Sequence, residues 1–305
     1  MKLGYLIIPA ASIIALTSCQ FNRNQTTGEF DDTQANTLIE MQAEDDLNKS
    51  KAILYTLPSP IEIASIIKES DVKYDEDLLN NISNSERYTS GLKMALNLGI
   101  YSSDMSLASM FNQSQKTVEY LNSLKSLSSR LGIAQLIDDE TISRLESKGT
   151  TKDEMLDIIS EVYMKINNYL TENNRKNVAT MVLVGGWTEG LYVALNIADV
   201  NADKNRLLAE RIIGQKMALN TVIDIIESTP NAENDQDLIY LKGKMNEIKV
   251  ILDEVHLETN GQITTETDAE NHLTIIHASK VNGISAEILT LLRDKVNEIR
   301  AEFIK

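Results

Sequence analysis

The 305-residue chain has one cysteine, four prolines and few aromatic residues. The cysteine is Cys19, so the rest of the chain forms no disulfide and offers no thiol chemistry. A carbohydrate-binding β-sandwich needs many turns and aromatic platforms, and four prolines with 5% aromatic residues argue against that class. The chain is still long enough to bury a sizeable core without cross-links.

Positive charge is scarce as well. Lys and Arg together number 29 against 45 Asp and Glu, which gives a formal net charge of −16. Binding to nucleic acid depends on clustered Lys and Arg that release counterions, and peripheral binding to an anionic membrane needs a similar basic patch. We therefore expect neither partner for the folded surface. The acidic excess indicates a solvated surface and identifies no substrate.

The N-terminal segment has the features of an export signal. Lys2 is followed by an almost unbroken apolar stretch from Leu3 to Leu16, and then by Thr17, Ser18 and Cys19. A charged start, a short apolar segment and small residues before a cysteine resemble the lipobox of bacterial lipoproteins. The resemblance implies that residues 1–18 are a signal peptide, which is removed, and that Cys19 becomes the lipid-modified N-terminus.

A single transmembrane helix is the alternative interpretation of this segment. About 20 apolar residues are needed to cross a bilayer, and this run is shorter and contains Pro9. Residues 19–36 are mostly polar without periodicity, so we expect a flexible tether that reaches on the order of 20 Å. Acidic residues directly after the lipid-modified cysteine would resemble a signal for surface display. In this chain, Asp31 and Asp32 lie further along the tether and do not directly follow Cys19. We therefore expect an outer-membrane position facing the periplasm, with surface exposure as the alternative.

From Thr37 to Lys305, apolar residues recur at spacings of three and four. This pattern predicts one all-α domain over 37–305, built as an antiparallel bundle or array of about nine or ten helices. The clearest amphipathic segments are 151–170, 206–226 and 285–304. Their apolar residues are Met155, Ile158, Ile159, Val162, Met164, Ile166 and Leu170; Leu208, Ile212, Ile213, Met217, Leu219, Val222 and Ile226; and Ile288, Leu291, Leu292, Val296, Ile299 and Phe303.

Local signals mark several helix boundaries. Ser59 before Pro60 predicts a helix start, and Thr151 with Glu154 three positions later predicts a capping box. Helix ends are predicted at Gly132, at Gly149 and at Thr229 with Pro230. One stretch is different: residues 255–267 contain Asn260 and Gly261 between residues that tolerate β-structure, which favours a small hairpin there.

Three glycines between residues 185 and 190 flank Trp187, the only tryptophan. Each glycine in a helix costs about 1 kcal/mol relative to alanine, so something should compensate. We favour close helix packing with Trp187 as a core anchor. The alternative is that the missing side chains open a pocket beside Trp187, Glu189 and Tyr192.

A second polar cluster covers residues 97–104. We expect Asp104 to cap or bracket a helix turn, and a ligand-binding role is the alternative. Combining the two segments gives a hypothetical concave ligand pocket, whose residues are Trp187, Glu189, Tyr192, Tyr101 and Asp104.

One loop resembles a calcium site in its spacing. Oxygen-bearing residues fill positions one, three, five, seven and twelve of an EF-hand-like loop: Asp199, Asn201, Asp203, Asn205 and Glu210. Lys204 stands where glycine makes the turn, and Arg206 where an apolar residue packs. We therefore favour an ordinary loop between helices with Asp203 as an N-cap, and we expect no cofactor.

No spacing of potentially catalytic residues in the sequence predicts an active site. His272 and His277 are five residues apart and do not share a helical face, which argues against zinc. No His-Glu-x-x-His motif, Gly-x-Ser-x-Gly elbow or phosphate-binding glycine loop occurs. Acidic runs such as 138–140 are expected in an acidic chain and support no glycosidase. Since acid–base chemistry needs a placed pair of groups, an enzyme is the least favoured class.

Several of these segments together resemble a family of uncharacterised α-helical lipoproteins of the Bacteroidetes group. The resemblance rests on the lipobox, on residues 55–60, on Leu96–Tyr101 and on Gly185–Trp187. That family has no assigned activity, so the resemblance supports the location alone. We expect a non-enzymatic module that presents helical grooves to a protein or small ligand of the envelope. A structural or assembly accessory is the second hypothesis, and a hydrolytic enzyme is the third.

Overall fold

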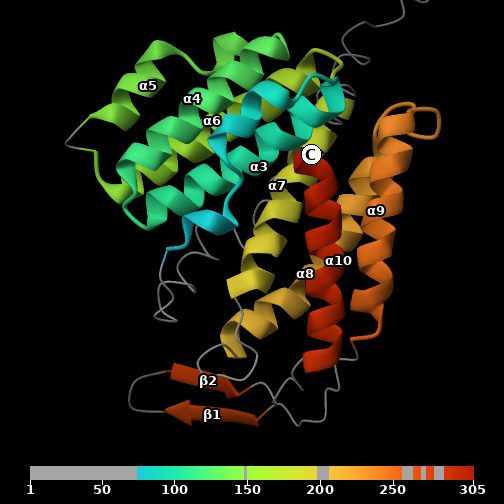
Figure 1. Ribbon diagram of the computed structural model, residues 1–305. Coiled ribbons are helices and arrows are strands. Elements are labelled where there is room, and N and C mark those ends of the chain that lie inside the picture. The colour runs from blue at the N-terminus through green and yellow to red at the C-terminus, as the bar shows by residue number, and fades with distance from the viewer. Residues whose placement is uncertain (1–73, 148–149, 198–205, 256–263, 269–272, 278–284) are drawn as a thin grey trace, which may run out of the picture. The chain divides into compact units, whose positions relative to one another are not determined.

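A computed structural model describes residues 74–147, 150–197, 206–255, 264–268, 273–277 and 285–305 (Figure 1). All of them belong to one compact unit. The predicted signal peptide, Cys19, the tether, the helix start at Ser59 and the helix end at Gly149 lie outside the described residues. The described part is mostly helical, which confirms the all-α class.

The 3₁₀-helices η1 (Glu76–Leu78) and η2 (Ile82–Arg87) precede α3 (Gly91–Met110) and α4 (Ser114–Arg130). After them come η3 (Ala134–Leu136), α5 (Asp139–Glu146), α6 (Lys152–Glu172) and α7 (Lys176–Ile197). The chain then forms α8 (Arg206–Ser228), α9 (Gln236–Asp253) and α10 (Ala286–Ile304). Helix α7 is central, because it packs against α3, α6, α8, α9 and α10. By length and composition α7 could also cross a membrane, but most of it is buried inside the fold.

The boundaries predicted from local signals are confirmed where the structure describes them. Thr151 caps α6, with its hydroxyl accepting from Glu154 N at 3.3 Å and Glu154 Oε2 accepting from Thr151 N at 2.7 Å. Gly132 follows α4 with a φ of 74°, a conformation that glycine adopts without steric cost. Helix α8 ends at Ser228, before Pro230, and Ser285 caps α10.

The side chain of Leu208 is not described; among the other predicted apolar residues most are buried or partly buried, but two are exposed. Met217 is 76% exposed and Leu291 is 50% exposed. Each lies two positions from a buried leucine, Leu219 or Leu289, which is about 200° around a helix. Both were assigned to the apolar face because they are apolar, although their position around the helix turns them outward.

The hairpin occurs later in the chain than predicted. Strands β1 (Thr264–Asp268) and β2 (Leu273–His277) pair antiparallel, from Thr264 opposite His277 to Asp268 opposite Leu273. Both strands are rich in β-branched Thr and Ile, which favour extended backbone. The strands are therefore joined after Asp268 and not at Asn260 and Gly261, which lie outside the described residues.

Helices α3 and α7 cross with their backbones in contact. A Cβ on Gly99 would lie 2.0 Å from the carbonyl oxygen of Val182, and a Cβ on Gly185 would lie 2.0 Å from that of Leu96. A Cβ on Gly186 would lie 3.4 Å from the carbonyl oxygen of Gly99. At Gly185, the backbone of α3 occupies the space that a side chain would need. This supports close packing as the explanation for the glycine-rich segment.

Candidate functional site: a buried polar cluster

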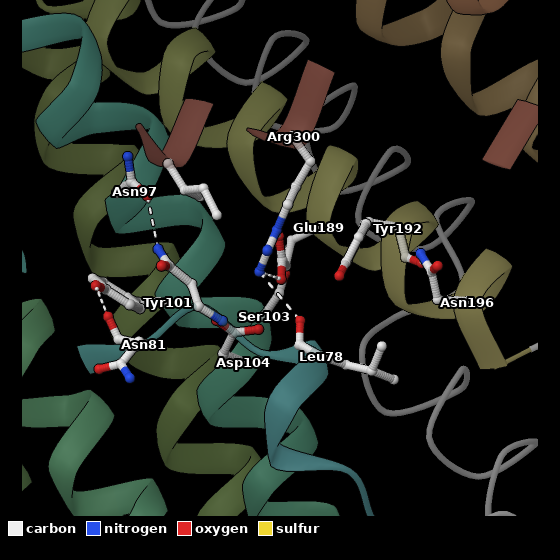
Figure 2. A network of polar contacts seen from close by, with 12 residues as sticks. Leu78, Asn81, Asn97, Tyr101, Ser103, Asp104, Glu189, Tyr192, Asn196 and Arg300 are labelled. Carbon is white, nitrogen blue, oxygen red and sulfur yellow. Dashed lines mark hydrogen bonds and ion pairs between the residues drawn. The ribbon is translucent and has the colours of Figure 1, made fainter. Parts of the chain in front are cut away.

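A buried ion pair joins α10 to α7. Arg300 donates from Nε and Nη2 to the two carboxyl oxygens of Glu189 at 2.9 and 2.8 Å (Figure 2). The Arg300 side chain is 9% exposed, and that of Glu189 is fully buried. Arg300 Nη2 also donates to the carbonyl oxygen of Leu78 at 3.3 Å. This two-bond geometry is the strong form of an Arg–carboxylate contact.

Tyr192 lies against the same guanidinium. Its ring centroid is 4.2 Å from Arg300 Cζ, which is a cation–π contact. Glu189 and Tyr192 are three residues apart on α7, so their side chains leave the same face of the helix. Burial raises the pKa of Tyr192, so its hydroxyl stays neutral beside the ion pair.

Asp104 brings a second carboxyl group to this place from α3. It is fully buried, and its Oδ2 accepts from the backbone N–H of Asn80 at 3.0 Å. Its Oδ1 accepts no hydrogen bond from the described residues. Burial raises the pKa of Asp104 well above its usual range, and the charge and hydrogen-bonding of neighbouring Glu189 raise it further, whereas Arg300 lowers it.

Asn80 connects this carboxyl group to a set of buried tyrosines. Its Nδ2 donates to the hydroxyl of Tyr88 at 2.9 Å, and its carbonyl oxygen accepts from Tyr120 at 3.3 Å. The Tyr101 hydroxyl donates to the carbonyl oxygen of Asn81 at 2.9 Å. Burial raises the pKa of all three tyrosines, which keeps them as neutral donors. Residues 80–81 are thereby fixed against α3 and α4.

The same region satisfies the C-terminal end of α10. The last carbonyl groups of a helix have no partner within the helix. Here they accept from side chains in and just before α3: Lys93 Nζ donates to the carbonyl of residue 302, Asn97 Nδ2 to that of residue 303 at 2.9 Å, and the Tyr88 hydroxyl to that of residue 304 at 3.3 Å. The end of α10 is therefore held by directed hydrogen bonds.

Four of the five residues predicted to form a pocket come together here: Tyr101, Asp104, Glu189 and Tyr192. Trp187 does not join them. It is two residues from Glu189, on the far side of α7, and its indole N–H donates to Gln215 of α8 at 3.1 Å. Trp187 is buried and serves as a core anchor.

Sequence reasoning missed Arg300, the cation at the centre of the cluster. A signal for it exists, because Arg300 falls within the apolar stripe that Leu289, Leu292, Val296 and Phe303 form on α10. A charged residue is almost never fully buried unless it is paired. An arginine in such a stripe therefore indicates a buried acidic partner, although it does not identify that partner.

The calcium hypothesis rests on residues that the structure does not describe. Asp199, Asn201 and Asp203 lie outside the described residues, and the side chain of Glu210 is not described either. Within the part of the chain that is described, no three His, Cys, Asp or Glu side chains are placed to hold a metal ion. In the acidic run 138–140, Asp138 caps α5, accepting from the backbone N–H of Thr141 at 2.7 Å.

The cluster is built to join helices. Its guanidinium and carboxyl groups face one another, and their contacts connect α3, α7, α10 and the segment before η2. Comparisons of the chain with protein-family models, with curated proteins and with solved structures found no match.

Proposed function

We propose that the protein is a lipid-anchored, non-enzymatic interaction module of the bacterial envelope, which binds a partner protein through α8, α9 and α10. One observation carries the proposal. Met217 on α8, Val250 on α9 and Leu291 on α10 are 76%, 65% and 50% exposed, and we call them the apolar cluster. Exposed apolar side chains that gather in one patch are typical of protein interaction surfaces.

Two ion pairs place the apolar cluster on neighbouring parts of the three helices. Lys216 of α8 lies 3.3 Å from Asp253 of α9, and Lys295 of α10 lies 3.1 Å from Glu247 of α9. Every member of the apolar cluster is within about one helical turn of one of these four residues. Each of the three side chains therefore lies near a contact between α8 and α9 or between α9 and α10.

The interior supports an interaction role over a catalytic one. Among the described residues, the ionisable groups gathered in the interior are Asp104, Glu189 and Arg300, and they engage one another. A partner protein must also tolerate the net charge of −16. Electrostatic complementarity therefore favours a partner with an apolar contact area surrounded by basic residues.

Site-specific photo-crosslinking in the producing cell tests the proposal. A photoreactive amino acid in place of Met217 should give a discrete adduct with a protein. The matched control is the same substitution at Glu233, which is exposed in the connection between α8 and α9. Val250→Asp should reduce the Met217 adduct while the circular dichroism spectrum stays unchanged. Equal adducts from both positions, or none from Met217, would contradict the proposal.

The membrane anchor is a separate part of the proposal and has its own test. It is supported by the apolar run that ends just before Cys19. Mass spectrometry of the purified protein should find acylated Cys19 as the N-terminal residue, and Cys19→Ser should move the protein from the detergent phase to the aqueous phase. Protease protection in intact cells should then locate the domain in the periplasm. An uncleaved N-terminus would refute lipidation.

A further inference from the structure

The buried cluster contains two carboxyl groups and one guanidinium. Asp104 and Glu189 are fully buried, and Arg300 is nearly so. Arg300 directs two N–H groups to Glu189 and uses Nη2 also for the Leu78 carbonyl. Asp104 receives one backbone N–H, and its Oδ1 receives none from the described residues. With both carboxyl groups ionised, one negative charge in this interior would have no counterion, which is strongly unfavourable.

The other groups around Asp104 supply no further cation. Facing it are Tyr74 from the segment before η1, Tyr101 from α3, Tyr120 from α4, Glu189 and Tyr192 from α7, and Arg300 from α10. The tyrosines have pKa values raised by burial and remain neutral. In this described set, Arg300 is the one positive charge.

We infer that Asp104 and Glu189 hold one proton between them in the folded protein at neutral pH, and that this proton-binding site links α3 to α7. The proton turns the contact between two carboxyl groups into a hydrogen bond. It also leaves one negative charge for the one guanidinium. The site therefore holds α3, α7 and α10 together most strongly while the proton is bound, and we call it the proton-dependent lock.

The lock makes stability depend on pH in a definite direction. The pKa of Asp104 is higher in the folded chain than in the unfolded chain, because burial and Glu189 raise it. The folded state therefore binds more protons in the range between the two values. The stabilisation is complete below the unfolded pKa, about 4, and is lost as the pH rises through the folded pKa. In that range, the unfolding equilibrium constant should rise by up to about tenfold per pH unit.

Infrared spectroscopy of the soluble chain from residue 20 in D₂O tests the inference directly. The wild-type protein should show a protonated-carboxyl band at neutral pH, and the band should disappear at alkaline pH. Asp104→Asn keeps the shape of a protonated aspartate and can donate to Glu189, so it should fold, lose the band and show a weaker pH dependence of urea unfolding. Glu189→Gln should lose the band as well, because one carboxyl group then faces one guanidinium.

Asp294→Asn provides the matched control, since Asp294 is exposed on α10. This variant should retain both the band and the pH dependence. A wild-type spectrum without a protonated-carboxyl band at neutral pH would overturn the inference, even if neither buried variant folds. A band that persists in Asp104→Asn would also overturn it, because the proton would then lie elsewhere.

Discussion

Replacing Gly185 by alanine tests the close crossing of α3 and α7. The new Cβ would lie 2.0 Å from the carbonyl oxygen of Leu96, whereas favourable contacts between such atoms lie near 3.5 Å. The helices must therefore separate by more than about 1 Å. Overpacking of this kind costs typically 1 to 3 kcal/mol. We expect about 3 kcal/mol, because neither the new Cβ nor the carbonyl oxygen of Leu96 can move without moving its helix backbone. The higher helix propensity of alanine returns about 1 kcal/mol.

Gly243→Ala is the matched control for this substitution. Gly243 lies within α9, and a Cβ there would meet nothing within 4 Å. Helix propensity alone then acts, so Gly243→Ala should stabilise the protein by about 0.5 to 1 kcal/mol. Gly185→Ala should destabilise it by about 2 kcal/mol. Urea unfolding followed by circular dichroism measures both changes. If Gly185→Ala stabilises the protein as much as Gly243→Ala does, the backbone crossing is wrong.

Three further substitutions test separate contacts. Arg300→Leu should cost about 3 to 5 kcal/mol, because it leaves Glu189 buried without its cation, and urea unfolding measures the loss. Thr151→Ala should cost about 1 kcal/mol by removing the α6 cap, read from the same unfolding curves. Glu302→Gln tests acid-side behaviour: hydrogen bonds from Lys244 lower the pKa of Glu302, so its contribution is present above the unfolded pKa and is lost on acidification. The variant should therefore lose stability less steeply in acid than the wild type.

Local features of the fold could be predicted from the sequence. The capping box at Thr151 and the helix end at Gly132 depend on residues within one or two turns, so the pattern is sufficient. The buried faces of α6 and α8 follow from apolar spacing, which a helix converts into one side. Met217 was misplaced because it was assigned by its apolar character, although it lies about 200° around the helix from buried Leu219.

The buried cluster could be predicted only in part. Tyr101 and Asp104 were identified in the polar cluster 97–104, and Glu189 and Tyr192 in the glycine-rich segment around Trp187. Their common partner was not, because Arg300 is 111 residues beyond Glu189 in the chain. Such a pairing depends on how α7 and α10 pack, and no local pattern contains that information. The predicted hairpin was misplaced for a different reason: an Asn-Gly pair favours a turn but does not decide which neighbouring segments pair as strands.

The glycine crossing and the proton site are physically connected, and this gives a last prediction. Ser103 donates to the carbonyl oxygen of Gly186 at 3.0 Å, and Asp104 meets Glu189 about one turn beyond the crossing on each helix. A Gly185→Ala protein that folds holds these helices further apart. The two carboxyl groups should then share their proton less tightly.

Infrared titration measures this coupling. In Gly185→Ala the protonated-carboxyl band should disappear at a lower pH than in the wild type, since a wider gap weakens the hydrogen bond between the carboxyl groups and admits water. Gly243→Ala changes an exposed position on α9, so it should leave the titration unchanged. If Gly185→Ala and the wild type titrate together, the carboxyl pair does not depend on how closely α3 and α7 approach. The close crossing would then serve packing alone, and Asp104 and Glu189 would be positioned by Asn80 and Arg300.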